Sequence, residues 1–110
     1  MDPIDAGLCP KFHHAIEMVG RRWSGAIIML LVKRGSSRFN ELLSAIPGVS
    51  DRLLTERLRE LEAEGIILRR VEDGRPVRVT YELTEAGKDL EPAIAALGIW
   101  AERWAKAAVA

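Results

Sequence analysis

The sequence has only one cysteine, no long apolar run and no net charge, and each shortage excludes a class of protein. One cysteine cannot form an internal disulfide, which excludes the disulfide framework of small secreted domains. No apolar run approaches the roughly 20 residues that cross a bilayer. Residues 1–10 also lack the basic, apolar and small-residue order of a signal peptide. We therefore expect a cytoplasmic protein with no membrane partner.

The zero net charge argues against a protein that binds nucleic acid through overall basicity. The charge is nevertheless unevenly distributed. Residues 11–38 carry +5 and residues 69–81 carry +2, whereas residues 39–68 carry −3. Such clusters usually only solvate a surface, so their meaning depends on the elements that carry them.

Residues 38–65 predict two helices separated by a short break, the arrangement of a helix-turn-helix unit. Pro47 and Gly48 end the first helix, and Ser50 can cap the second by accepting a hydrogen bond from its free N–H groups. The second helix has the size that fits a DNA major groove. Apolar residues recur at helical spacing at Phe39, Leu42, Leu43 and Ile46 in the first helix and at Leu54, Leu58 and Leu61 in the second.

A hairpin is predicted directly after this unit. Residues 66–71 and 77–83 have the branched content and the alternation of two strands, and Asp73-Gly74 between them is a tight-turn signal. A basic hairpin that follows such a helix is the layout of a winged helix. Before the unit, Ser24 can cap an apolar helix that we expect to be buried on every side.

The C-terminal part is too apolar for a solvated tail. Thr84 can cap a helical region in which Leu97, Trp100 and Trp104 form an apolar stripe. A small winged helix does not need this stripe to close its core, so we expect it to bury against a second copy across a two-fold axis. The alternative is that it folds back on its own domain. The predicted fold is therefore α+β and mostly helical: one winged helix-turn-helix domain over residues 1–110, with an arm at 1–10, the helix-turn-helix at 38–65, the wing hairpin at 66–83 and a dimerisation region at 84–110.

The side of the second helix opposite its leucines carries the residues expected to meet DNA. Arg52 is the first candidate for a base edge, because a guanidinium can bond guanine O6 and N7 together. Thr55 and Arg59 can bond a base or a phosphate, and Ser50 lies where a phosphate meets a helix N-terminus. The alternative is a solvated face with i,i+4 pairs such as Arg52 with Glu56. The turn before the helix and the wing after it favour DNA.

The affinity for DNA must come largely from other residues, because Glu56 and Glu60 repel phosphate. Arg38, Arg75 and Arg78 are expected to supply it, together with the basic region before the unit. Alternatively, the arginines of the hairpin only keep its edge soluble. The rival hypothesis, motivated by the zero net charge and the acidic second helix, is a winged helix used as a protein-interaction module without DNA-binding activity.

Nothing in the sequence indicates an enzyme. It contains no glycine-rich phosphate loop, no cysteine pair and no serine and histidine in a known arrangement. His13 and His14 are adjacent and point to different sides of a helix, which is poor geometry for a metal site. We therefore expect neither a metal nor a cofactor.

Several short motifs occur together in a specific order and spacing. They are CP at 9–10, GRRW at 20–23, RFNEL at 38–42, PGVS at 47–50, LTERLRELEAEG at 54–65, RPVRVTYELTEAG at 75–87 and a late tryptophan at 100. The chain thereby resembles the HxlR-type winged-helix transcriptional regulators, which share their architecture with the MarR group. One departure is that Arg21 and Arg22 stand where the family commonly has glycine and lysine.

The resemblance implies a dimeric bacterial DNA-binding regulator, often a repressor, with the second helix in the major groove and the hairpin as wing. Two such helices would read a roughly palindromic operator at sites about one DNA turn apart, ~34 Å. The operator sequence, the regulated genes, the effector and the choice between repression and activation are left open.

The resemblance also implies a possible sensor, since some members detect electrophiles or oxidants through an N-terminal cysteine whose position Cys9 matches. Lys11, His13 and His14 are near enough in sequence to supply the positive charge that activates a thiol. A single cysteine per chain leaves an intersubunit disulfide, a mixed disulfide with a small thiol, or direct alkylation by a small molecule. The alternative is a buried, inert thiol.

Overall fold

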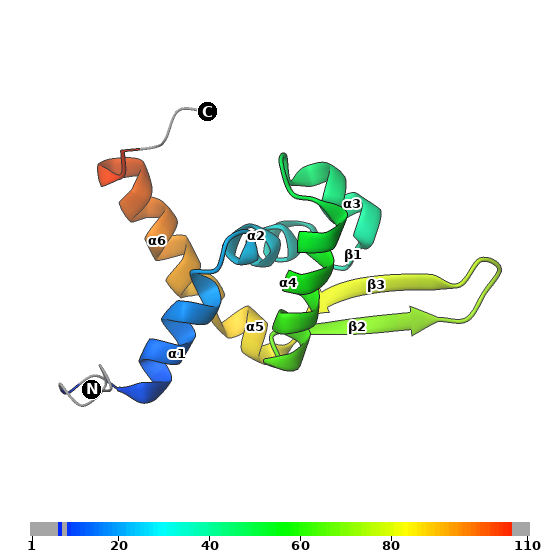
Figure 1. Ribbon diagram of the computed structural model, residues 1–110, viewed down its shortest axis with the longest axis horizontal. Helices are drawn as coiled ribbons and strands as arrows, with labels where there is room; N and C mark the ends of the chain where they lie inside the picture. Colours follow the sequence, from blue (N-terminus) through cyan, green and yellow to red (C-terminus); the bar gives the residue numbers. More distant parts are fainter. Residues whose placement is uncertain (1–6, 8, 107–110) are drawn as a thin grey trace.

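The protein has a central group of helices, with a hairpin extending from one side and two terminal helices extending from the other (Figure 1). The computed structural model describes residue 7 and residues 9–106. It confirms a mostly helical α+β winged helix. The elements are α1 (Pro10–Val19), α2 (Ser24–Arg34), β1 (Ser37–Arg38), α3 (Phe39–Ala45), α4 (Asp51–Ala63), β2 (Ile67–Glu72), β3 (Arg78–Leu83), α5 (Glu85–Asp89) and α6 (Glu91–Trp104).

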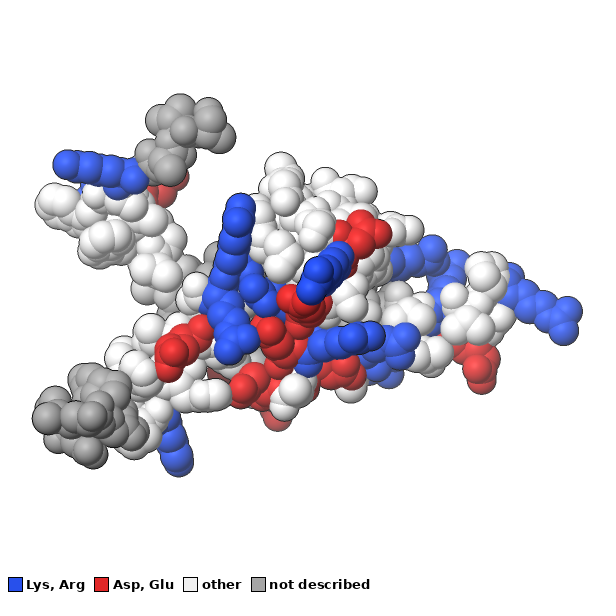
Figure 2. Space-filling model, viewed as in Figure 1, with Lys and Arg blue, Asp and Glu red and all other residues white. Residues whose placement is uncertain are grey.

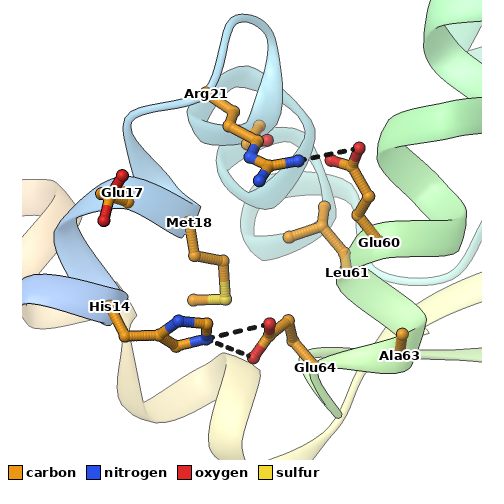
Figure 3. A pocket seen from close by; sticks show the side chains of 9 residues that line it. His14, Glu17, Met18, Arg21, Glu60, Leu61, Ala63 and Glu64 are labelled. Carbon is orange, nitrogen blue, oxygen red and sulfur yellow. Dashed lines mark hydrogen bonds and ion pairs between the residues drawn. The ribbon is translucent and has the colours of Figure 1, made fainter. Parts of the chain in front are cut away.

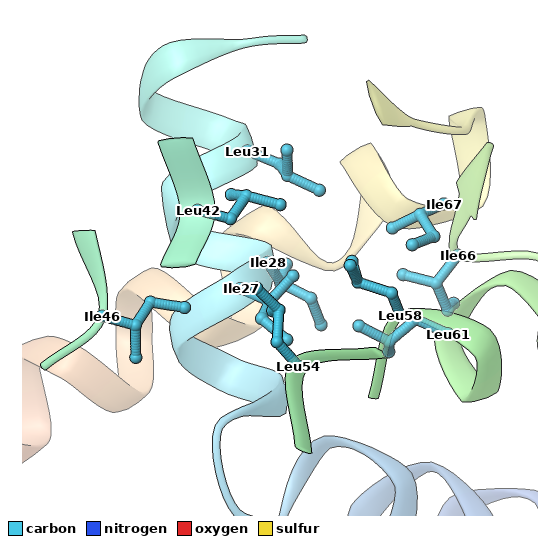
Figure 4. Close-up of a cluster of buried hydrophobic side chains, with 10 residues drawn as sticks. All are labelled: Ile27, Ile28, Leu31, Leu42, Ile46, Leu54, Leu58, Leu61, Ile66 and Ile67. Atoms are coloured by element: carbon cyan, nitrogen blue, oxygen red, sulfur yellow. The ribbon is translucent and has the colours of Figure 1, made fainter. Parts of the chain in front are cut away.

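The core lies where α2 meets α3, α4 and the base of the hairpin (Figure 4). Five of the seven apolar positions predicted for the helix-turn-helix are buried, and the other two, Phe39 and Leu43, are half-buried. The buried residues of α4 are its three leucines, which lie on one side of the helix. The ten buried apolar side chains are Ile27, Ile28, Leu31, Leu42, Ile46, Leu54, Leu58, Leu61, Ile66 and Ile67.

The prediction for α2 is wrong in two respects. Its buried residues form one side of the helix rather than its whole surface, and Ala26 is exposed. Ser24 does not cap the helix but is its first residue, with a buried side chain. Trp23 takes the cap position instead, with φ at +77°, in the left-handed region that side chains rarely adopt. Trp23 lies in the sharp turn between α1 and α2, which run in different directions (Figure 1).

The other predicted helix boundaries hold. The Ser50 hydroxyl accepts a hydrogen bond from the Leu53 N–H at 3.1 Å, which satisfies one of the free donors of α4. Gly48, in the break between α3 and α4, has φ at +90°, which glycine adopts without strain. The Thr84 hydroxyl accepts from the Gly87 N–H at 3.1 Å and begins α5.

The sheet contains a strand that the sequence did not predict. β1 is only two residues long and pairs antiparallel with β3, giving the order β1-β3-β2. The β2–β3 hairpin is confirmed. The prediction of a tight turn at Asp73-Gly74 is wrong, because a longer connection over residues 73–77 joins the strands. Pro76 lies within it and has no N–H to offer the ladder.

The N-terminal segment forms α1, and the C-terminal segment forms α5 and α6. Pro10 already belongs to α1, and the rest of the predicted arm lies mostly outside the described residues, as do residues 107–110 of the predicted dimerisation region. Pro92 lies in the first turn of α6, where its missing N–H costs nothing. None of the described helices combines the length and the apolar content that crossing a bilayer requires.

Candidate nucleic-acid interface

The helix α4 presents four distinct sides to its surroundings. Its leucines face the core, and one flank faces α1 and the turn that follows it. The opposite flank faces the wing, where Thr55, Arg59 and Glu62 line a cleft against β2 and β3. The fourth side is left for solvent or a ligand. The polar residues of α4 are therefore divided among α1, the wing and the open side.

The outward side carries Arg52 and Glu56, as predicted, whereas Arg59, expected on the same side, lies on the flank that faces the wing. The Arg52 side chain is 89% exposed, and its Nε lies 3.4 Å from the Glu56 carboxylate. This is the i,i+4 pair of the solvated-face alternative, and an exposed pair of this kind contributes only about 0.3–0.5 kcal/mol. A guanine edge can therefore displace Glu56 at little cost. The Thr55 hydroxyl donates to the Asp51 carbonyl at 2.8 Å.

The wing carries exposed arginines along its length. Arg75 lies in the connection beyond the strands, and Arg78 begins β3. Figure 2 shows basic side chains extending along the hairpin to its far end, whereas basic and acidic side chains are mixed over the centre of the molecule. The positive charge available to a polyanion is therefore concentrated on the wing rather than on α4.

Arg38 lies beside the wing rather than on the face of α3. It forms β1 with Ser37 and pairs with Thr80 of β3, which places an exposed arginine beside the middle of the hairpin. Its backbone N–H donates to the Glu41 carboxylate at 2.8 Å, and this bond fixes the start of α3. The pairing of β1 with β3 thus joins the residue that precedes α3 to the wing.

The flank of α4 that faces α1 is held by polar contacts that the sequence did not reveal. The Arg57 guanidinium donates from Nε to the Arg22 carbonyl at 2.8 Å. Arg21 and Arg57 both bind the Glu60 carboxylate, at 3.0 and 3.2 Å. Figure 3 shows Arg21 reaching across to Glu60 from the α1 side. The expectation that Glu60 repels phosphate is wrong, because two guanidinium groups neutralise it on a side turned away from the wing.

His14 also contacts the flank of α4 that faces α1. Its Nε2 lies 2.9 Å from the Glu64 carboxylate at the end of α4, whereas Nε2 of His13 lies 2.8 Å from Glu17 within α1 (Figure 3 shows the His14 pair). The adjacent histidines thus point to different partners. Among residue 7 and residues 9–106, no cluster of three or more His, Cys, Asp or Glu side chains could hold a metal ion.

The tryptophan of the GRRW motif packs against the break of the helix-turn-helix. A Cβ added at Gly48 would lie 3.5 Å from the Trp23 ring, so the indole lies directly against this glycine. The Arg22 guanidinium stacks over the same ring at 4.9 Å from its centre. Trp23 thereby connects the joint between α1 and α2 with the turn that orients α4. Its indole N–H is buried without a hydrogen-bond partner among the described residues.

The stripe predicted on the last helix is exposed in the single chain. Leu97, Trp100 and Trp104 are 60%, 55% and 61% exposed, so the alternative that they fold back on their own domain is wrong. The helix α1, which has no buried residue, adds Phe12 and Ile16, which the sequence did not assign to an interface. Both helices extend from the side opposite the wing (Figure 1). Large exposed apolar side chains in this number are typical of a surface that binds another protein.

Cys9 is exposed and precedes the first turn of α1, so the alternative of a buried thiol is wrong. Its carbonyl accepts from the His13 N–H at 3.0 Å. The exposed thiol therefore lies at the start of α1, the helix whose His14 pairs with Glu64 at the end of α4.

Residues 18–109 match the family described as HxlR-like helix-turn-helix. The HTH-type transcriptional regulator YvaP of Bacillus subtilis is 42% identical over 97 residues, which cover 88% of this chain and 89% of YvaP. The reduced form of the regulator YodB from B. subtilis superposes with a TM-score of 0.82 at 40% identity, covering 89% of this chain and 95% of that chain. Quinone-bound YodB from the same organism gives a TM-score of 0.76 at 38% identity, covering 87% and 99%.

Proposed function

The chain belongs to the HxlR-like helix-turn-helix family of DNA-binding transcriptional regulators, and from this premise we propose that it is a cytoplasmic two-fold dimer that represses transcription by occupying a palindromic operator. Each recognition helix, α4, lies in a major groove, and each β2–β3 wing lies against the flanking duplex. The effector is a small electrophile or oxidant that acts on Cys9.

One observation carries the DNA-binding role. The side of α4 that is covered neither by the core, nor by α1, nor by the wing in the described part of the chain presents Arg52, with Thr55 and Arg59 at its edge. Ser50 lies at the start of the same helix and exposes its hydroxyl next to free N–H groups. This arrangement can offer hydrogen bonds to base edges and phosphates together. The exposed arginines of the wing supply the attraction that the acidic α4 lacks.

The exposed stripe of α6 supports the dimer. Leu97, Trp100 and Trp104 present large apolar surfaces to solvent in the single chain, and tryptophan is enriched at interface cores. A two-fold axis places the same surface on both copies, and it sets the two recognition helices at a fixed spacing of about 34 Å. A palindromic operator follows from that symmetry.

Cys9 supports the response to an effector. The thiol is exposed, and YodB is known in a reduced and a quinone-bound form. A quinone would alkylate the thiol, and an oxidant would join it to the partner's Cys9 or to a small thiol. Either product changes the start of α1, which is connected to α4 through the contacts of Arg57, Glu60 and Glu64.

The test begins with selection of a bound duplex from a random pool, followed by gel shift of two kinds of variant. Arg52→Ala should reduce discrimination between the selected and a mutated duplex, by about tenfold for one lost bidentate contact. Arg75→Ala and Arg78→Ala should instead weaken binding to all duplexes and lower the slope of log K against log salt by about 0.9 each. If neither kind of change occurs on the selected duplex, these roles are wrong.

The rival hypothesis, a protein-interaction module without DNA-binding activity, predicts a different result. Such a protein binds no duplex even at ~50 mM salt, where phosphate contacts are strongest. The zero net charge of the chain and the net negative charge of α4 are the features that favour it. Failure of the selection at that salt concentration would decide for the interaction module.

A further inference from the structure

We propose that the cleft between α4 and the wing binds a single backbone phosphate of the duplex, through the guanidinium groups of Arg59 and Arg69 and the hydroxyl of Tyr81. The inference rests on the proposed DNA-binding function and adds two residues to it. The cleft has a volume of about 290 Å³. It is lined by Thr55, Leu58, Arg59, Glu62, Arg69 and Tyr81.

The strand register brings two of these side chains to the cleft. Ile67 is buried beneath α4, and Arg69, two residues further along β2, lies on the same face of the sheet. Tyr81 is the direct partner of Arg69 on β3, just as Leu83 is the partner of Ile67. Arg69 and Tyr81 therefore lie side by side at the edge of the hydrophobic core, against which Tyr81 packs, and both face α4.

The charges of the cleft are available to an anion. Arg59 and Arg69 take part in none of the ion pairs formed among the described residues, whereas Arg21, Arg52, Arg57 and Arg70 all do. Glu62 is the one carboxylate in the cleft, which leaves it with a net positive charge. Arg59, Arg69 and Tyr81 come from three different elements and can all donate to a phosphate oxygen, the two guanidinium groups through strong charge-assisted hydrogen bonds.

The position of the cleft matches the path of the DNA backbone. A helix in the major groove and a wing against the adjacent minor groove lie on either side of the sugar–phosphate strand that separates the two grooves. That strand must cross the gap between α4 and the hairpin, and Arg59 and Arg69 line the cleft in this gap. A phosphate held there would fix the register of α4 along the groove without reading a base.

Arg70 provides a matched control. It is the neighbour of Arg69 on β2 but points to the other face of the sheet, where its Nε binds the Glu82 carboxylate at 2.8 Å. Arg69→Gln and Arg70→Gln each remove one positive charge from the same strand. Only the first removes a donor from the cleft, so a difference between them measures the phosphate contact rather than the overall charge.

The experiment measures binding of full-length variants to the duplex selected from a random pool. Arg69→Gln should weaken binding about tenfold and lower the salt slope by about 0.9. Arg70→Gln should weaken it by no more than about twofold. Tyr81→Phe should weaken binding about threefold with an unchanged salt slope, because a neutral hydroxyl releases no counterion. Equal losses for Arg69→Gln and Arg70→Gln would overturn the proposal.

A second arm identifies the phosphate. Duplexes with one neutral methylphosphonate linkage at successive positions should show one position at which Arg69→Gln and Arg59→Gln no longer weaken binding. The shared contact would be overturned if the two variants still bound more weakly than the wild type at every position of the methylphosphonate linkage. It would also be overturned if the loss of affinity vanished at different positions for the two variants.

The two failures can be told apart. If the wild type selects no duplex, the proposed function fails and the phosphate site fails with it. If the wild type selects a duplex, and Arg69→Gln and Tyr81→Phe both bind that duplex as tightly as the wild type does, only the phosphate site is wrong.

Discussion

Gly87→Ala should destabilise the protein by about 2–4 kcal/mol, although alanine is normally the better residue in a helix. Gly87 is buried in α5, where this short helix crosses the start of the hairpin. A Cβ at this position would lie 2.2 Å from the Ile66 carbonyl oxygen and 2.9 Å from a methyl group of Leu83. The first distance is far below contact distance, and the atom it meets is backbone.

The size of this destabilisation depends on the Ile66 carbonyl, which must move to make room for the new Cβ. The Ile66 carbonyl accepts a hydrogen bond from the Thr84 N–H at 3.0 Å and shares the single hydroxyl hydrogen of Thr84 with the Gly65 carbonyl, so it cannot withdraw without weakening both bonds. Overpacking of this kind costs about 1–3 kcal/mol, and each weakened hydrogen bond adds about 1 kcal/mol. The better helix propensity of alanine returns about 1 kcal/mol at most. The net loss is then about 2–4 kcal/mol.

Urea unfolding at one fixed protein concentration measures this loss as a lower transition midpoint with an unchanged slope. Gly25→Ala is the control: Gly25 is also helical, in α2, but a Cβ there would meet no atom within 4 Å. It should be neutral or stabilise the protein by up to about 1 kcal/mol. If the two variants unfold at the same urea concentration, the close approach of α5 to Ile66 is wrong.

Two further predictions concern the terminal helices. Quinone treatment should lower the affinity of the wild type for its selected duplex about tenfold in a gel shift, whereas Cys9→Ser should keep its affinity under the same treatment; an equal response of both proteins would remove Cys9 as the sensor. Trp100→Glu should weaken the dimer by at least about 2 kcal/mol, because it places a charge in the apolar stripe of α6. Sedimentation equilibrium would show a shift toward monomer, and a wild type that is already monomeric at the same concentration would refute the dimer.

The sequence by itself determined the elements whose signals are local. The break at Pro47 and Gly48 and the caps at Ser50 and Thr84 depend on the dihedral angles and hydrogen bonds of a few neighbouring residues. The leucines of α4 repeat at helical spacing, so the helix and its buried side could be predicted together. The motifs that span most of the chain were enough to predict the family, which the match over residues 18–109 confirms.

Other features needed the tertiary structure, because they depend on how distant elements pack. β1 is too short to carry a strand signal, and only its pairing with β3 brings Arg38 to the wing. The sequence cannot show that Glu60 is neutralised from the turn after α1, since its partner Arg21 is far away in the chain.

The cleft at the wing is the clearest case of a feature that only the tertiary structure decided. Arg69 and Tyr81 share it with Arg59 because the register of β2 and β3 turns both side chains toward α4. Alternation along one strand predicts which residues share a face. It does not predict which helix covers that face, because the packing of α4 on the sheet is set by the whole hydrophobic core.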